Sequence, residues 1–236
     1  NQFVSWLGIS YTDKGDYWTI VPVGLSLYNG LLGIAMFLAY LGKITNNSTH
    51  TQLARKTIET ILYQAENEEG LISDIGVFEG WGGIIYVLSH LGTLWNDDHL
   101  IEKATSIANS LEKKISEDSK FDIISGSAGC ITALITLSKV TNLSYPLELA
   151  AICGDHLIAN AKVLDGGIAW LQQNISTIDK PLTGFAHGVA GISWALSQLA
   201  EETQIVRYQK IAQKSLSYER NLYSTTFQNW PDLRNY

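Results

Sequence analysis

Apolar residues recur with helical spacing along most of the chain, in two alternating kinds of segment. The first kind is apolar on nearly all sides and follows a pair of glycines separated by two residues. It occupies residues 30–42, 80–92, 126–138 and 188–200, so that the first glycines are 50, 46 and 62 residues apart. A helix that is apolar all round is buried, and each segment therefore predicts an inner helix. The recurrence indicates an internal repeat.

The second kind of segment has one apolar and one polar face. Its apolar residues are three or four positions apart, which predicts an amphipathic helix. The four stripes are Leu53, Ala54, Ile58, Ile61 and Leu62; Leu100, Ala104, Ile107, Ala108, Leu111 and Ile115; Leu147, Ala150, Ala151, Leu157, Ile158 and Ala161, opened by Ser144 and Pro146; and Ile205, Tyr208, Ala212 and Leu216. Each inner helix is thus paired with an outer one. Four such pairs predict an all-α solenoid, or a ring if its curvature closes.

Residues 1–25 follow neither pattern. They are rich in aromatic and β-branched residues and are punctuated by glycine and proline. We expect an irregular lead-in with a short hairpin at Lys14-Gly15, and the four helix-pair repeats then fill residues 26–236. Strand signals beyond residue 25 are nearly absent.

Composition narrows the class of protein. The 236 residues are 46% hydrophobic and 17% charged, which is typical of a folded chain of one large or two small domains. The net charge of -7 and the lack of a basic run argue against a nucleic-acid partner. Two cysteines make no disulfide framework, so a reducing compartment is expected. No apolar run is long enough to span a membrane. Both ends look cut, and we expect the natural chain to be longer.

The paired glycines need a physical reason, because glycine inside a helix costs roughly 1 kcal/mol relative to alanine. Without side chains they allow backbones to approach closely and leave the N–H groups of the helix start accessible. If the inner helices run parallel, all four glycine corners meet at one end of a cavity. The residues that precede the corners would then line its mouth: Asn29, Glu79, Ser125 and His187.

Two of the residues near these corners are candidates for chemistry. His187 is the only histidine in the corner position, and it is either a structural residue or a group that moves a proton near neutral pH. Asp122 lies four residues before a corner glycine, among apolar neighbours. It is either a helix cap or a charged group held in the mouth. For Glu79 and Asp74 a solvated loop position is favoured.

The sulfur-bearing residues give no metal site by spacing alone. Cys130 begins an apolar run, which favours a small buried residue. Cys153 and His156 are three residues apart on one helix, but two ligands are too few for zinc. Phosphate-binding, hydrolase and zinc-protease motifs are missing from the sequence.

Four stretches together resemble the C-terminal cyclase domain of the class II lanthipeptide synthetases (LanM), a domain that is similar to the stand-alone LanC cyclases. They are LSLYNGLLGIAMFLAYLG, DIISGSAG, LTGFAHGVAGISWALSQLA and SYERNLYSTTFQNWPDLR. The resemblance covers nearly the whole chain in consistent order. It implies an α,α-toroid of inner and outer helices, of which about four of seven pairs are visible here.

The resemblance also implies an activity. A zinc ion in the family binds cysteine thiols of a precursor peptide, and the thiolate adds to dehydroalanine or dehydrobutyrine to form lanthionine or methyllanthionine rings. Zinc lowers the thiol pKa, and a general acid must then protonate the resulting enolate. His187 matches the family's active-site histidine, a proposed acid or base. Asp122 matches the active-site aspartate, proposed to assist proton handling.

The family's zinc ligands depart from this sequence. They are two cysteines and a histidine in a Trp-Cys-x-Gly and a later Cys-His-Gly motif, and neither motif occurs here. Cys130 and Cys153 do not take their places, so we expect the ligands beyond Tyr236 and the 236 residues alone to be inactive. The full-length protein is expected to carry an N-terminal dehydratase region that uses ATP and magnesium.

The resemblance therefore predicts a cytoplasmic lanthionine synthetase that acts on the leader and core of a precursor peptide, with an export transporter as a further partner. Two alternatives remain open. One is a non-catalytic α-solenoid that binds peptides, which agrees with the absence of the zinc motifs from this sequence. The other is a helical glycoside-processing enzyme, which needs two carboxylates, and Asp122 with Glu79 is its only candidate pair.

Overall fold

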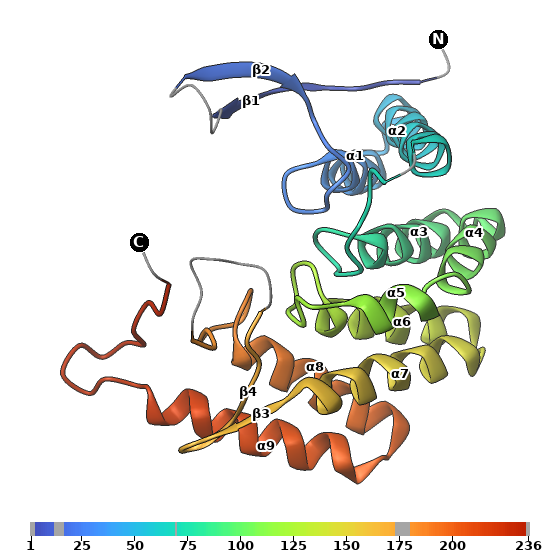
Figure 1. Ribbon diagram of the computed structural model, residues 1–236. Helices are drawn as coiled ribbons and strands as arrows, with labels where there is room; N and C mark the ends of the chain where they lie inside the picture. The colour runs from blue at the N-terminus through green and yellow to red at the C-terminus, as the bar shows by residue number, and fades with distance from the viewer. Residues whose placement is uncertain (1–2, 12–16, 69, 173–179, 235–236) are drawn as a thin grey trace. The chain divides into compact units, whose positions relative to one another are not determined.

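The computed structural model describes residues 3–11, 17–68, 70–172 and 180–234. The chain divides into two compact units, Asn1–Ser73 and Asp74–Tyr236. The described residues form nine α-helices and two short two-stranded sheets (Figure 1). The all-α fold class is confirmed, and the helix pairs are consistent with the expected α,α-toroid.

The first unit holds a hairpin and one helix pair. Strands β1 (Leu7–Tyr11) and β2 (Trp18–Pro22) are antiparallel, with Leu7 opposite Pro22 and Tyr11 opposite Trp18. Helix α1 (Leu31–Thr45) packs on α2 (Ser48–Asn67). The short hairpin expected within the irregular lead-in is confirmed, because alternating β-branched and aromatic residues pair as strands on either side of Lys14-Gly15. The expected turn at Lys14-Gly15 lies outside the described residues.

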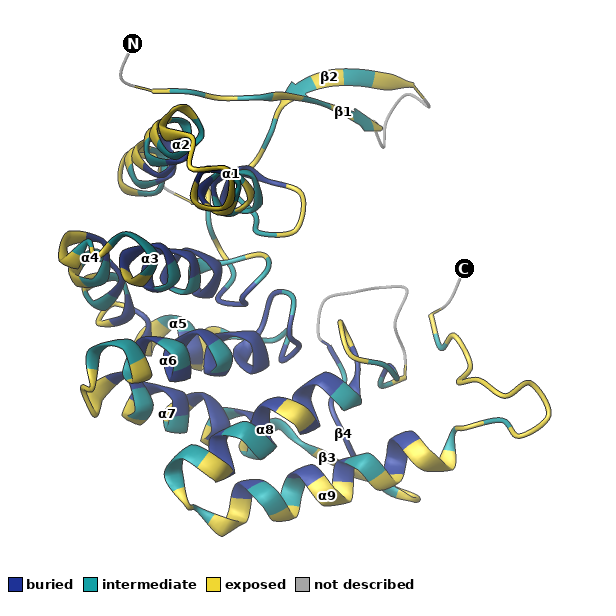
Figure 2. Ribbon diagram, turned by 180° about the vertical axis from the view of Figure 1, so that it is seen from behind, coloured by how far each residue is buried: buried dark blue, intermediate teal, exposed yellow. Residues whose placement is uncertain are grey.

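The second unit holds three helix pairs. They are α3 (Trp81–Trp95) with α4 (Asp98–Ala108), α6 (Ser127–Thr141) with α7 (Tyr145–Asn160), and α8 (Val189–Thr203) with α9 (Val206–Asn221). Helix α6 packs between α3 and α8, and each of the three packs on the helix that follows it. In Figure 2, α3 and α6 are mostly buried, whereas α9 alternates buried and exposed positions. The two kinds of predicted helix are therefore confirmed.

The four inner helices share one design at both ends. Each has 15 residues and begins directly after a corner glycine. Each is followed by a residue in the left-handed region, which ends the helix. These residues are Asn46 (φ 51°), Asn96 (φ 51°), Asn142 (φ 57°) and Gln204 (φ 59°).

Two elements differ from the sequence prediction. The outer helix expected over residues 100–115 is broken after Ala108, and α5 (Glu112–Glu117) follows as a separate short helix. Strands β3 (Lys162–Leu164) and β4 (Gly167–Ala169) form an unexpected antiparallel hairpin. Its turn contains Asp165-Gly166, a strong hairpin signal, and Gly166 has φ 97°.

The corner glycines pack against the loop that precedes them. A Cβ atom on Gly129 would collide with the carbonyl oxygen of Ile123, and one on Gly191 with that of Phe185. The close backbone approach predicted for these glycines is thus confirmed. The prediction that they leave the helix-start N–H groups accessible is wrong. Those groups donate to carbonyls seven residues upstream in every repeat: Leu31 to Gly24, Trp81 to Asp74, Ala128 to Phe121 and Val189 to Leu182.

Within the second unit, one corner is hydrogen-bonded to the next. The carbonyl of Ser125 accepts the N–H groups of Ile75 (3.1 Å) and Gly76 (2.8 Å), and that of Ile124 accepts the N–H of Glu79 (2.8 Å). These bonds hold the corner before α3 against the corner before α6. These two corners thus form one hydrogen-bonded backbone framework.

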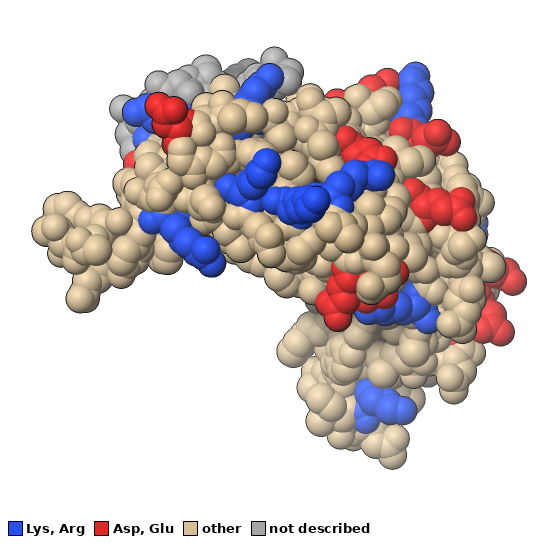
Figure 3. All heavy atoms as spheres, turned by 90° about the horizontal axis from the view of Figure 1, so that it is seen from below, with Lys and Arg blue, Asp and Glu red and all other residues tan. Residues whose placement is uncertain are grey.

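Surface charge and helix length agree with the sequence. On the face drawn in Figure 3, lysine and arginine form a short row and acidic side chains lie beside them, so this face carries both signs. Among the helices of the described residues, none is both long and apolar enough to cross a membrane.

Candidate functional site

Asp122 lies at the corner before α6 and is 1% exposed. Its Oδ1 accepts the N–H groups of Ser125 (2.8 Å) and Gly126 (3.2 Å). Its Oδ2 accepts Gln172 Nε2 (2.6 Å) and His187 Nδ1 (2.7 Å). Four donors on a buried carboxylate fix its orientation and compensate its burial.

The loop that presents Asp122 is held by a second carboxylate. Asp118 accepts the N–H of Lys120 through Oδ1, and the N–H (2.8 Å) and hydroxyl (2.6 Å) of Ser127 through Oδ2. Asp118 therefore caps the start of α6, and Asp122 instead bonds the turn before it. Phe121, which directly precedes Asp122, is 2% exposed and has φ 67°. A bulky residue in this region stores strain of about 1–3 kcal/mol, which is often found at functional sites.

His187 lies at the corner before α8, and its side chain is 54% exposed. Nδ1 donates to Asp122, which leaves Nε2 for a substrate, and among the described residues none bonds to Nε2. The hydrogen bond that His187 donates to Asp122 is the main cause that raises the pKa of His187. The negative charges of Asp122 and Glu79 add to it, while partial burial and Arg234 lower the pKa. The imidazolium form therefore persists to a higher pH than in an unperturbed histidine.

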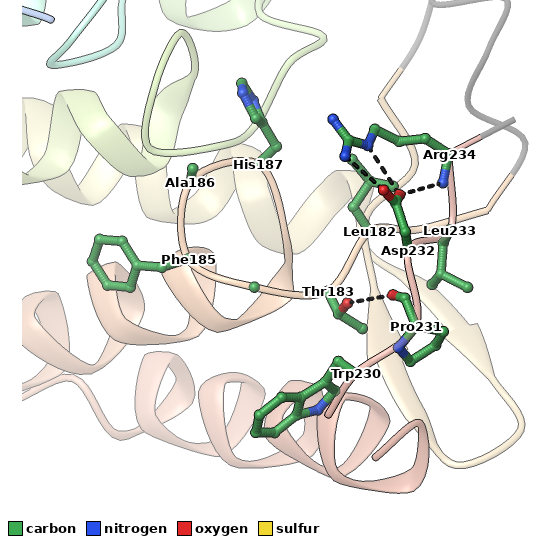
Figure 4. Close-up of a pocket in the computed structure, with 11 residues that line it drawn as sticks. Leu182, Thr183, Phe185, Ala186, His187, Trp230, Pro231, Asp232, Leu233 and Arg234 are labelled. Carbon is green, nitrogen blue, oxygen red and sulfur yellow. Dashed lines mark hydrogen bonds and ion pairs between the residues drawn. The ribbon is translucent and has the colours of Figure 1, made fainter. Parts of the chain in front are cut away.

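An open pocket of about 310 Å³ adjoins His187. One wall is the loop before α8, with Thr183, Phe185 and His187, and the other is the segment after α9. Figure 4 shows that this second wall brings Trp230 and Arg234 to the same pocket. Arg234 is paired with Asp232 at 2.6 Å. The pocket thus combines a proton carrier, aromatic surface and a guanidinium group.

The last turn of α9 supports the His187 loop from below. Glu219 is 7% exposed and accepts the N–H of Gly184 at 2.8 Å. Among the residues that the structure describes, none forms a hydrogen bond with its other oxygen, Oε2. The Trp230 indole donates to the backbone carbonyl of Glu219 at 2.8 Å. Burial raises the pKa of Glu219.

The remaining corner residues have different places. Glu79 is exposed and acts on His187 through its charge alone, and Ser125 contributes its backbone to the framework of corners. Asp74 accepts the N–H of Trp81 through its carbonyl. Asn29 belongs to the first unit, where its side chain accepts the hydroxyl of Ser26 at 2.7 Å. Asp122, one of the two carboxylates that the glycoside-processing alternative requires, accepts four hydrogen bonds, which disfavours it as a free general acid.

The cysteines and histidines present do not fit a zinc site. In the part of the chain that the structure describes, no three His, Cys, Asp or Glu side chains are grouped to hold a metal ion. Cys130 and Cys153 are both free and buried, which confirms the expectation of a small buried residue for Cys130. Burial, with a hydrogen bond to Cys130, raises the pKa of Cys153 well above its usual value, so it remains a thiol. His156 Nε2 is bonded to the carbonyl of Asp118 at 2.8 Å.

Sequence analysis missed four residues at this site: Gln172, Glu219, Trp230 and Arg234. Gln172 is carried by the chain leaving β4, and the Asp165-Gly166 turn could have revealed that hairpin. The other three lie in SYERNLYSTTFQNWPDLR, a stretch that supports the resemblance but has no distinctive spacing.

The comparisons with known proteins are consistent with the geometry of the site. The family model described as lanthionine synthetase C-like protein matches residues 21–236, which include both corners of the His187–Asp122 pair. No curated protein matches the chain. Because the match spans most of the chain, the protein belongs to the lanthionine synthetase C-like family.

Proposed function

We propose that the chain is the cyclase region of a class II lanthipeptide synthetase. Membership of the family supports a lanthionine cyclase-type function in general. The observation that carries the finer proposal is the His187–Asp122 pair beside an open pocket. The substrate is a precursor peptide whose cysteine thiols add to dehydroalanine or dehydrobutyrine.

In this reaction the sulfur bonds to the β-carbon, and the electron pair of the double bond moves toward the carbonyl to give an enolate. The α-carbon then takes a proton from Nε2 of the His187 imidazolium. Asp122 stabilises that imidazolium through Nδ1–H and holds the ring in one orientation. The thiol proton leaves to solvent, and the half-exposed His187 regains a proton from the same source. Atoms and charges balance over one ring closure.

Zinc is part of the proposal, although the residues described here do not form its site. When bound, it would supply a thiolate at neutral pH. Its ligands are proposed to follow Tyr236 in Trp-Cys-x-Gly and Cys-His-Gly motifs. No step assigned to His187 or Asp122 passes through the metal.

The class II assignment extends to the rest of the enzyme. The full-length protein is proposed to dehydrate serine and threonine in an N-terminal region with ATP and magnesium, and then to cyclise the product here. The tyrosine before the first corner and the stretch that ends in NWPDLR support class II over the stand-alone cyclases. Two free thiols suit a reducing cytoplasm. Association with an export transporter is a further part of the proposal.

The test uses the full-length enzyme with the precursor peptide encoded beside it. His187→Ala should abolish or strongly slow ring closure and leave dehydration intact, because only the proton carrier is lost. Mass spectrometry counts lost waters, and thiol alkylation counts cysteines left unclosed. His99→Ala, at an exposed position on α4, is the matched control and should cyclise normally.

Normal ring closure by His187→Ala would overturn the assigned role of His187. A full-length protein that binds the precursor but closes no rings would instead favour the non-catalytic peptide-binding solenoid.

A further inference from the structure

Glu219 is a buried carboxylate that the proposed chemistry does not use. It is 7% exposed, and its Oε2 has no hydrogen-bond partner in the part of the chain that the structure describes. A buried acceptor without a partner costs free energy, so its presence calls for an explanation. The residues that line the pocket beside His187 come from 182–187 and 230–234, so Glu219 lies outside that lining.

The partners of Glu219 are the two ends of the loop that carries His187. Its carboxylate accepts the N–H of Gly184 at 2.8 Å, three residues before His187. The N–H of Ala190, three residues after His187, also acts on the carboxylate and lowers its pKa, as the Gly184 N–H does. Gly184 has φ 93°, so the chain reverses at the point that Glu219 holds.

Glu219 is itself held in place from two sides. Trp230 Nε1 donates to its backbone carbonyl at 2.8 Å. The preceding residue, Tyr218, donates its hydroxyl to the carbonyl of Pro181 at 2.9 Å, just upstream of the same loop. The last turn of α9 is therefore held in place and contacts the loop that carries His187.

We propose that Glu219 is a positioning residue, whose carboxylate fixes the loop 184–188 and the start of α8 so that His187 stays hydrogen-bonded to Asp122. The charge of Glu219 is not among the causes that shift the pKa of His187. Its effect on His187 is therefore geometric and depends on an acceptor oxygen rather than on charge. The inference rests on the proposed function only where it concerns the rate of ring closure.

The experiment compares three variants of the full-length enzyme: Glu219→Leu, Glu219→Gln and Ser215→Ala. Leucine removes the acceptor, whereas glutamine keeps one oxygen for the Gly184 N–H. Ser215 is the matched control, since it is buried one turn earlier on α9 and bonds Ser193 instead of the loop. The pKa of His187 is followed by deuterium exchange of its C2 proton, read peptide by peptide by mass spectrometry.

In Glu219→Leu the pKa of His187 should fall toward its ordinary value, because the loop shifts and the bond to Asp122, its main raising cause, is lost. Glu219→Gln and Ser215→Ala should keep the wild-type pKa. The kcat of ring closure should fall on the order of tenfold to a hundredfold in the leucine variant, with KM little changed. Glutamine should restore it.

A folded Glu219→Leu variant with unchanged His187 pKa and kcat would overturn the inference, as would a glutamine variant as impaired as leucine. If the leucine variant does not fold, amide exchange in the wild-type protein decides. Protection of the Gly184 amide relative to those of Phe185 and Ala186 supports the inference, and equal exchange overturns it. A lowered His187 pKa in Glu219→Leu, with normal ring closure by His187→Ala, would uphold the positioning role and reject the proposed function.

Discussion

A single hydrogen bond of 2.7 Å gives His187 both its orientation and its charge preference. Asp122 cannot turn away, because each of its oxygens accepts two donors. The imidazole is therefore held by Nδ1, and Nε2 is the nitrogen available for proton transfer. A rigid carboxylate beside a half-exposed ring combines orientation with access to solvent protons.

The charge of Asp122 predicts a pH dependence. Ring closure that depends on the imidazolium should slow as pH rises through the pKa of His187, which the Asp122 hydrogen bond raises. Asp122→Asn keeps an acceptor but removes the negative charge, so the falling limb of the pH–rate profile should move to lower pH. Initial rates of thiol loss across a pH series measure this.

Glu79→Gln provides the matched comparison. Glu79 raises the pKa of His187 through its charge alone and from an exposed position. The falling limb of the pH–rate profile of Glu79→Gln should therefore also move to lower pH, but by less than that of Asp122→Asn. A limb that stays in place in Asp122→Asn would contradict the assignment of His187 as the titrating acid.

The sequence could identify His187 and Asp122 but not their supports. His187 is the odd member of four repeated positions, and Asp122 precedes a repeated glycine among apolar residues. Gln172 reaches Asp122 across 50 residues of sequence, and Glu219 reaches Gly184 across 35. Such contacts depend on how α9 and the β3–β4 hairpin pack, and no local pattern encodes that packing.

At the scale of elements, the ends of the inner helices predict a stabilising substitution. Three of the four helices end on a left-handed asparagine, and α8 ends on Gln204 with φ 59°. Asparagine tolerates this conformation better than glutamine. Gln204→Asn should therefore raise the free energy of unfolding by about 0.5–1 kcal/mol.

Thermal unfolding measures that gain, which corresponds to a rise in Tm of about 1–4 °C. Asn46→Gln is the reciprocal change at the end of α1 and should lower Tm. A loss of stability in Gln204→Asn would show that the side chain of Gln204, bonded to the carbonyl of Glu201 at 2.6 Å, matters more than its backbone.

Element prediction succeeded where apolar periodicity was long and failed where it continued through a break. Leu111 and Ile115 keep the stripe of α4, and both are buried, yet the helix stops at Ala108 and restarts at Glu112. Periodicity reports which side faces the core and does not require one unbroken helix. The three-residue strands β3 and β4 are too short to produce an alternation.

At the scale of the whole molecule, the donor set predicts the metal content. The chain of 236 residues should purify with much less than one zinc per molecule, because its two cysteines are buried and no ligand cluster occurs among the described residues. Elemental analysis after dialysis measures this. Tight stoichiometric zinc would contradict the proposal that the ligands follow Tyr236, and the full-length enzyme should retain the metal under the same conditions.

The hydrogen bond between His187 and Asp122 has a consequence for how such a chain can change in evolution. Asp122 comes from one repeat and His187 from the next, so the pair belongs to the junction and neither repeat carries it alone. Insertion of a duplicated helix pair between α7 and α8 would separate the two residues even if every helix still folded. Gene rearrangements that insert a repeat at this junction should therefore be selected against.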